Sequence, residues 1–253
     1  MKILLSPAKS LDYTTALPTA DSTMPQFLDK TLEISRVMKK KSERDLASLM
    51  GISSNLAALN YARFESFSEK FTSLNSRPAL FAFAGDVYTG LDAYTLKEEE
   101  INRTQNRVRI LSGMYGMLRP LDLLQPYRLE MGTKVAIGEK KNLYDFWKEQ
   151  VTGALNEELS PKTLVVNLAS NEYFKAVDKR KLKGELIHPV FKDYKNGKLK
   201  TISFYAKKAR GMMTRYLIEK DQVTMDTILQ FAEDGYSYSE KNSKDAQHPT
   251  FTR

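Results

Sequence analysis

Polar side chains suited to acid–base or anion-binding chemistry stand just beyond apolar runs that are typical of buried strands. Ser6 and Lys9 follow the run Lys2–Leu5, and Asp86 follows the run 79–84. Open α/β sheets place their ligands at strand ends, so a hydroxyl, an amine and a carboxylate at these positions would face a cleft. The alternative is structural, because Ser6 and Asp86 also suit turns and Lys9 suits a solvated surface. From the residue types alone the structural interpretation is favoured for Ser6 and Lys9, whereas the two interpretations of Asp86 are equally good.

A long apolar loop, residues 112–133, carries a second group of polar side chains. Pro120 and Pro126 prevent one continuous helix across it, although many of its residues need burial. A proline-kinked apolar segment of this length would lie over a core, and its polar side chains would then be held in fixed places. These side chains are Arg119, Gln125, Tyr127, Arg128 and Glu130. Rigid loops of this kind commonly carry function.

Together these positions suggest a pocket for an enzyme that acts on a nucleotide or a nucleic-acid base. The segments SPAK, GDVYTG and LRPLDLLQPYR would line it, with Ser6, Lys9, Asp86, Arg119, Tyr127, Arg128, Asn171 and Lys207 as candidate residues. Five of them are predicted to converge on one cleft: Lys9, Asp86, Arg119, Arg128 and Lys207. No nucleophile–base pair and no cofactor fingerprint accompanies them, so no reaction is identified and no cofactor is expected.

Two further segments suit contact with a DNA backbone, and the first is LASLMGISSNLAAL, residues 46–59. It resembles a helix-hairpin-helix, in which Gly51, Ile52 and Ser53 would bring backbone N–H groups close to a phosphate. Ser53 stands where a second glycine is usual, which weakens the expected approach. An ordinary hairpin of two packed helices is an equally good interpretation.

The second segment is a predicted helix at 206–220. Lys208, Gly211 and Arg215 lie along one of its flanks, so two long cations stand on either side of a glycine. A phosphate backbone would find room in such a groove. A solvated basic flank is the alternative.

The composition limits the possible partners and cofactors. A formal charge of +8 and an isoelectric point near 9.3 favour a polyanionic partner such as DNA, duplex or distorted. The absence of cysteine excludes disulfide and thiolate chemistry, and two isolated histidines exclude a histidine-rich metal site. The longest apolar run, 79–84, is far too short for a membrane span, which needs about 20 residues. We therefore expect a cytoplasmic monomer without a metal or a membrane partner.

Hydrophobic periodicity predicts a single domain of mixed α/β class, residues 1–236, followed by a polar tail, 237–253, that is expected to fray. Strands are expected at 2–5, 79–84, 108–112, 163–168, 185–191 and 199–205. They would form one central, mostly buried mixed sheet closed by a hairpin at Asn196-Gly197. Helices are expected at 27–38, 42–50, 53–64, 95–104, 143–155, 172–177 and 206–220. Trp147 is predicted to lie in the core rather than to stack on a ligand.

Five long motifs carry a resemblance to a known family. They are KILLSPAKSLDY, FAGDVYTGLDA, SGMYGMLRPLDLLQPYRLEMG, VNLASNEYFKAV and SFYAKKARG, in this order from Lys2 onwards. The chain resembles the bacterial YaaA family of peroxide-stress resistance proteins up to about Tyr236. The resemblance implies a cytoplasmic protein that protects cells from oxidative DNA damage, binds DNA through a fold of its own and lowers free iron indirectly. It favours the functional interpretation of Ser6 and Lys9, but it implies no reaction.

Overall fold

The computed structural model describes residues 1–253, and a five-stranded sheet of order β6-β5-β1-β8-β9 lies at its centre. Its strands are β1 (Lys2–Leu5), β5 (Val108–Ser112), β6 (Gly116–Leu118), β8 (Leu164–Asn167) and β9 (Glu185–Ile187). β1 pairs in parallel with β5 and β8, β9 is parallel to β8, and β6 is antiparallel to β5. The mixed α/β class and the three predicted strands 2–5, 108–112 and 163–168 are confirmed.

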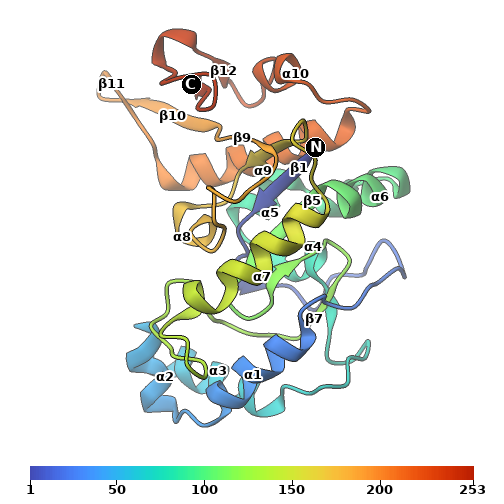
Figure 1. Ribbon diagram of the computed structural model, residues 1–253, viewed down its shortest axis with the longest axis vertical. Helices are drawn as coiled ribbons and strands as arrows, with labels where there is room; N and C mark the ends of the chain where they lie inside the picture. The colour runs from blue at the N-terminus through green and yellow to red at the C-terminus, as the bar shows by residue number, and fades with distance from the viewer.

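Helices cover both faces of this sheet (Figure 1). They are α5 (Asp86–Leu91), α6 (Glu98–Arg107), α7 (Leu143–Glu157), α8 (Asn171–Phe174) and α9 (Ser203–Glu219), whereas α10 (Met225–Leu229) lies away from this sheet at the top of Figure 1. In Figure 1 α7 lies in front of the sheet, while α5, α6 and α9 lie behind it. Trp147 on α7 is fully buried, and its indole N–H donates to the carbonyl oxygen of Gly113 at 2.9 Å. The predicted core role of Trp147 is confirmed.

Three helices, α1 (Leu28–Lys39), α2 (Glu43–Met50) and α3 (Ser54–Ser66), form a separate layer at the bottom of Figure 1. α2 begins at a capping box in which Ser42 and Asp45 exchange hydrogen bonds. It ends at Gly51, whose φ of 59° is left-handed and favours glycine. The local sequence therefore specifies two helices joined by a tight turn.

A second sheet, of order β11-β10-β13-β12, lies apart from the first. Its strands are β10 (Val190–Lys195), β11 (Lys198–Lys200), β12 (Ser237–Tyr238) and β13 (Thr250–Thr252). Positive φ at Asn196 and Gly197 confirms the predicted two-residue hairpin. The expectation that this hairpin closes the central sheet was wrong. Pro189 has no amide hydrogen for a ladder, and the chain leaves β9 there to enter the second sheet.

The C-terminal residues do not fray as expected. Strand β13 pairs with β10 and β12, and Phe251 is fully buried. Its ring stacks on Phe191 with the centroids 5.6 Å apart. The polar composition of 237–253 concealed the single aromatic side chain that anchors the strand.

Two other expectations about elements also fail. The run 79–84 is mostly the short helix α4 (Ala79–Ala82), and only β4 (Phe83–Ala84) is extended. A short, fully buried apolar run has no periodicity that distinguishes a strand from a helix. The predicted strand 199–205 ends at Lys200, because α9 already begins at Ser203. The remaining elements are β2 (Ser10–Leu11), which pairs with β4, β3 (Arg77–Pro78), which pairs with β7 (Leu123–Leu124), and two short 3-10 helices, Ala93–Thr95 and Glu240–Asn242.

Candidate functional site

The carboxyl ends of three parallel strands, β5, β1 and β8, meet at one edge of the central sheet. β1 lies between the other two, and the chain passes first to β5 on one side and later to β8 on the other. In open α/β sheets such a reversal of strand order opens a crevice in which ligands bind. The segments that follow β1 and β8 border this crevice.

Hydrogen bonds tie the segments after β1 and β8 together. The Ser170 N–H donates to Ser6 Oγ at 2.8 Å, and the Tyr88 hydroxyl donates to the Ser6 carbonyl oxygen at 3.1 Å. Gly85 is in close contact with this loop, since a methyl group placed on it would lie 3.3 Å from the Ala8 Cβ. Ser6, in the loop after β1, thus lies beside the N-terminal ends of α5 and α8, where Asp86 and Asn171 stand.

Charged side chains gather at the same edge. Glu130 Oε1 lies 2.6 Å from Lys9 Nζ and 3.1 Å from Arg128 Nη2, so one carboxylate serves two cations. Arg128 Nε is buried and has no hydrogen-bond partner. On the side of α5, Lys207 Nζ lies 3.9 Å from the Asp86 carboxylate. We call this group the strand-end cluster: Ser6, Lys9, Asp86, Arg128, Glu130, Asn171 and Lys207.

Tyr127 lies beneath this cluster rather than on its surface. It is 5% exposed, and its hydroxyl is 2.7 Å from Ser112 Oγ. Burial raises the pKa of Tyr127, so the phenol stays protonated at neutral pH. Its ring contacts those of Phe83 and Tyr115. The side chain therefore supports the loop from inside.

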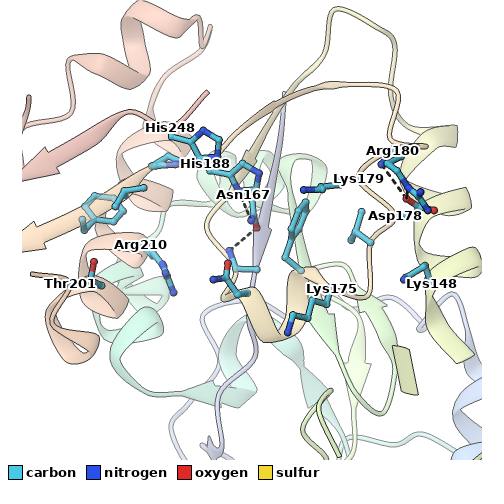
Figure 2. A pocket seen from close by; sticks show the side chains of 18 residues that line it. Lys148, Asn167, Lys175, Asp178, Lys179, Arg180, His188, Thr201, Arg210 and His248 are labelled. Carbon is cyan, nitrogen blue, oxygen red and sulfur yellow. Dashed lines mark hydrogen bonds and ion pairs between the residues drawn. The ribbon is translucent and has the colours of Figure 1, made fainter. Parts of the chain in front are cut away.

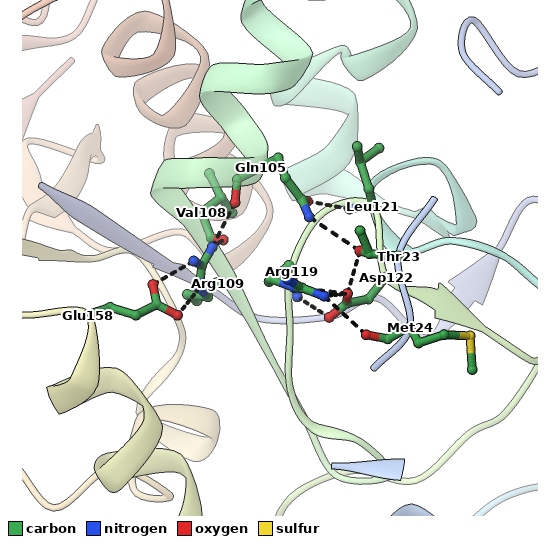
Figure 3. Close-up of polar contacts among 9 residues, drawn as sticks. All are labelled: Thr23, Met24, Gln105, Val108, Arg109, Arg119, Leu121, Asp122 and Glu158. Atoms are coloured by element: carbon green, nitrogen blue, oxygen red, sulfur yellow. Dashed lines mark hydrogen bonds and ion pairs between the residues drawn. The ribbon is translucent and has the colours of Figure 1, made fainter. Parts of the chain in front are cut away.

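Arg119 does not join the cluster, which corrects one of the five predicted positions. β6 runs antiparallel to β5, so the residue that follows β6 lies at the opposite edge of the sheet. There the Arg119 guanidinium holds the buried Asp122 carboxylate at 2.9 and 3.1 Å (Figure 3). Asp122 also accepts a hydrogen bond from Thr23 at 2.6 Å. Arg119 is a structural residue that fastens the N-terminal loop.

The stripe on α9 does not form the predicted groove. Gly211 is buried where α9 crosses α5, and a methyl group there would overlap the carbonyl oxygen of Val87. Arg215 is engaged by Glu219 at 2.6 Å and donates to Thr95 Oγ1 at 2.8 Å. Lys208 lies 3.6 Å from Asp234. Gly211 allows α9 to pack closely against α5. The prediction that Gly211 forms the floor of a groove for a phosphate backbone was therefore wrong.

The turn between α2 and α3 is on the surface. Gly51 and Ser53 are exposed, and Ile52 is partly buried. Ser53 Oγ accepts the Leu56 N–H at 3.4 Å and so caps α3. A methyl group at Gly51 would meet nothing within 4 Å, so the left-handed φ, not crowding, favours glycine there. Contact of this turn with DNA remains a prediction.

A cleft of about 800 Å³ opens beside the strand-end cluster at the carboxyl ends of β8 and β9 (Figure 2), and Asn171 is the one predicted pocket residue that lines it. We call it the basic cleft. Its charged side chains are Lys148 from α7, Lys175, Lys179 and Arg180 from α8 and the segment after it, Arg210 from α9, and one carboxylate, Asp178. Asp178 pairs with Arg180 at 3.6 Å. The other charged side chains of the lining are all cations, so the lining is strongly positive. The basic run KAVDKRKLK, residues 175–183, is the sequence signal for the positive charge of this cleft.

Two imidazoles lie at the upper side of this cleft in Figure 2. The rings of His188 and His248 stack with centroids 5.2 Å apart. His188 Nδ1 is 2.9 Å from the Asn167 amide nitrogen, whose oxygen accepts the Ala169 N–H. Burial, with the positive charge of His248 and Lys179, lowers the pKa of His188 to about 4. The ring is therefore neutral at pH 7, with Nδ1 as acceptor and its proton on Nε2.

The arrangement can hold anions but shows no metal centre. No group of three or more histidine, aspartate or glutamate side chains is placed to bind a metal ion. The side chains of Lys148, Lys175, Lys179 and Arg210 make no ion pair, so the basic cleft retains unbalanced positive charge. Phosphate groups are the obvious complement of such a lining.

Comparisons with known proteins give a consistent picture. A family model described as peroxide stress protein YaaA matches residues 1–242. A UPF0246 protein of Flavobacterium johnsoniae is 53% identical over 253 residues, which is 100% of both chains. A UPF0246 protein of Flavobacterium psychrophilum is 54% identical over 96% of this chain and 97% of its own. One from Aliivibrio fischeri is 51% identical over 96% of this chain and 95% of its own.

Proposed function

Because the chain belongs to the peroxide stress protein YaaA family, we propose that it serves the peroxide stress response by binding DNA in its basic cleft. The observation that carries this proposal is the unbalanced positive charge of the cleft. In this proposal the protein acts as a cytoplasmic monomer and protects DNA directly, whereas any effect on free iron is indirect. None of its helices combines the length and hydrophobicity needed to cross a bilayer.

The charges stand on more than one wall of the cleft. Lys148 comes from α7, Lys175 and Lys179 from the segment at α8, and Arg210 from α9 (Figure 2). Lysine and arginine contacts to phosphates position a nucleic acid but do not distinguish its bases. Binding is therefore independent of sequence.

A salt titration with fluorescently labelled DNA tests the proposal. If about five phosphates are neutralised, log affinity should fall against log salt with a slope of roughly −4 to −5. Replacing Lys175 and Lys179 with Ala should weaken binding to all sequences alike and reduce the slope by about two. The matched control replaces Lys97 and Lys162, which are exposed and do not line the cleft. Salt-independent affinity, or full binding by the folded cleft variant, would refute the proposal.

The turn between α2 and α3 is proposed as a second contact. It lies on the same left-hand side of Figure 1 as α8. Gly51→Asn should preserve binding, because Asn tolerates the left-handed φ of 59°. Gly51→Val should weaken binding, because a β-branched residue strains the turn that presents the backbone N–H groups. Equal affinity of the two folded variants would exclude the turn from the interface.

A second function has support from one observation at the strand-end cluster. Arg128 Nε is buried without an acceptor, in the strand-end cluster at the edge where open sheets bind ligands. An acceptor on a nucleotide or a nucleic-acid base would satisfy it, which makes an enzyme acting on such a substrate the alternative. The test is a mass-spectrometric search for converted nucleotides or bases, with Lys9→Ala as the comparison. A complete absence of product with wild-type protein would dismiss this alternative.

A further inference from the structure

Arg210 differs from the other partly or fully buried arginines of the fold. The guanidinium of Arg109 is held by Glu158, that of Arg119 by Asp122, and those of Arg103 and Arg107 by the last carbonyl oxygens of α9. Arg210 is partly buried in the wall of the basic cleft, and its guanidinium makes no hydrogen bond and no ion pair. Partial burial lowers the pKa of Arg210 from its ordinary value.

A charge in this situation destabilises the fold unless an anion accompanies it. Removing a guanidinium from water is costly, and that cost is offset only by a partner charge with satisfied hydrogen bonds. The protein supplies no such partner, because Asp178, the one carboxylate of the cleft, is engaged by Arg180. No carboxylate of the cleft is therefore free to pair with Arg210, which leaves its guanidinium open to an anionic ligand.

Other donors line the cleft with Arg210 and are also uncommitted. The side chains of Asn171 and Thr201 make no hydrogen bond, and Asn167 fixes the His188 proton on Nε2, which has no partner. Arg210, Thr201, Asn167 and His188 lie on the same side of the cleft in Figure 2. Several donors and no free carboxylate match a group with three terminal oxygens and a charge near −2, which is a phosphate monoester. A phosphodiester offers two such oxygens and a single charge.

We propose that the part of the basic cleft around Arg210 is a subsite for a phosphate monoester, the terminal phosphate of a nucleotide or of a nucleic-acid strand. The cleft, at about 800 Å³, is within the size range of nucleotide-sized ligands. This subsite rests on the proposed function, since it assigns part of the cleft to the phosphorylated end of a nucleic-acid strand. It adds a preference for ends that general phosphate contacts would not produce.

Isothermal titration with matched single-stranded oligonucleotides tests the subsite. The strands are identical except for a 5′ phosphate, a 3′ phosphate or none, and a free mononucleotide forms the fourth arm. Wild-type protein should bind at least one phosphorylated end about tenfold more tightly than the plain strand, the usual size of a lost charge-assisted contact. Arg210→Gln should abolish this preference, so that plain and phosphorylated strands bind with equal affinity. Arg210→Lys keeps the charge without the planar fork and should retain part of the preference.

A second measurement does not depend on DNA. Inorganic phosphate should raise the melting temperature of wild-type protein above that in chloride of equal ionic strength, but not that of Arg210→Gln. Arg210→Gln should itself melt no lower than wild type without phosphate, because it removes an uncompensated charge. Equal affinity for plain and phosphorylated probes with normal salt dependence would refute the subsite and leave DNA binding in place. Loss of all salt-dependent binding in wild type would refute both.

Discussion

At the scale of single residues, Arg109, Glu158 and Lys2 form a charged cluster at the edge of the central sheet where its parallel strands begin. Arg109 is 5% exposed and forms two parallel hydrogen bonds with Glu158, at 3.0 and 2.5 Å (Figure 3). Lys2 also pairs with Glu158. Although burial opposes ionisation, the bonds from Arg109 and Lys2 hold the pKa of Glu158 below its usual range. The contribution of Glu158 to stability is therefore complete at neutral pH and is lost as the pH falls through that lowered pKa.

Glu158→Ala should destabilise the protein strongly. It leaves the Arg109 guanidinium buried without a counterion, and breaking such a pair costs about 3–5 kcal/mol. Urea denaturation at pH 7 measures the loss. Glu33→Ala is the control, because its pair with Lys30 is exposed and contributes at most about 1 kcal/mol. Equal costs for the two variants would contradict the buried character of the Glu158 group.

His188 should make the protein sensitive to mild acid. Its pKa is about 4 in the folded state against the ordinary histidine value of 6.5 in the unfolded chain, so between these values only the unfolded chain takes up the proton. The free energy of unfolding therefore decreases as the pH falls from 6.5 to about 4. His188→Gln removes this titration and should flatten the fall in melting temperature across that window. Parallel profiles for the two proteins would show that His188 already accepts a proton in the native state.

At the scale of elements, the crossing of α5 and α9 depends on two glycines. At Gly211 a methyl group would lie 2.7 Å from the Leu91 nitrogen, and at Gly90 one would overlap the Lys208 carbonyl oxygen. The crossing places Lys207 on α9 beside Asp86 on α5, so it also builds one side of the strand-end cluster. Backbone contact of this kind is possible only without side chains at the crossing.

Gly211→Ala should therefore destabilise the fold even though alanine favours helices. Forcing the helices apart costs about 1–3 kcal/mol, which exceeds the helix-propensity gain of about 1 kcal/mol. Gly153→Ala is the matched control, because this glycine lies within α7 with open space around its Cα and should stabilise by up to about 1 kcal/mol. Chemical denaturation of both variants gives the comparison. Stabilisation by Gly211→Ala would mean that the crossing is looser than described.

At the scale of the whole molecule, the C-terminus completes the second sheet. β13 is the only strand that joins β10 to β12, and Arg253 fixes its end by pairing with the buried Asp193 at 2.9 Å. The Arg253 guanidinium also stacks on the rings of Tyr205 and Tyr236 at 4.6 and 4.7 Å. α9, which carries Arg210, contacts β10 of this sheet. The last residues therefore help to hold one wall of the basic cleft.

Phe251→Ala should destabilise the second sheet and, through it, the wall of the basic cleft. Phe251 is fully buried between Phe191 and Phe231, and truncation of such a side chain costs about 3–5 kcal/mol. Lys244→Ala, an exposed change in the same C-terminal segment, should cost almost nothing. Thermal melts give the stability, and DNA affinity of the folded fraction shows whether the cleft is affected. A wild-type melting temperature for Phe251→Ala would mean that the C-terminal residues contribute nothing to stability, as expected of a frayed tail.

The elements that the sequence determined by itself are those with local causes. Alternating and branched apolar residues specify 108–112, the Asn196-Gly197 pair specifies a hairpin, and Ser42 and Gly51 delimit α2. Each follows from backbone preferences and hydrogen bonds within a few residues. The same holds for the residues just beyond β1 and β8, because strand ends in a parallel sheet share one edge.

Tertiary structure alone decided which distant segments meet. The antiparallel direction of β6 carried Arg119 away from the strand-end cluster, although both follow strands of one sheet. The basic cleft combines side chains of α7, α8 and α9, whose spacing in the chain contains no common pattern. Gly211 was predicted to face a ligand, but it faces the backbone of α5. Strand direction and helix crossing depend on packing between residues far apart in the chain, which local preferences do not encode.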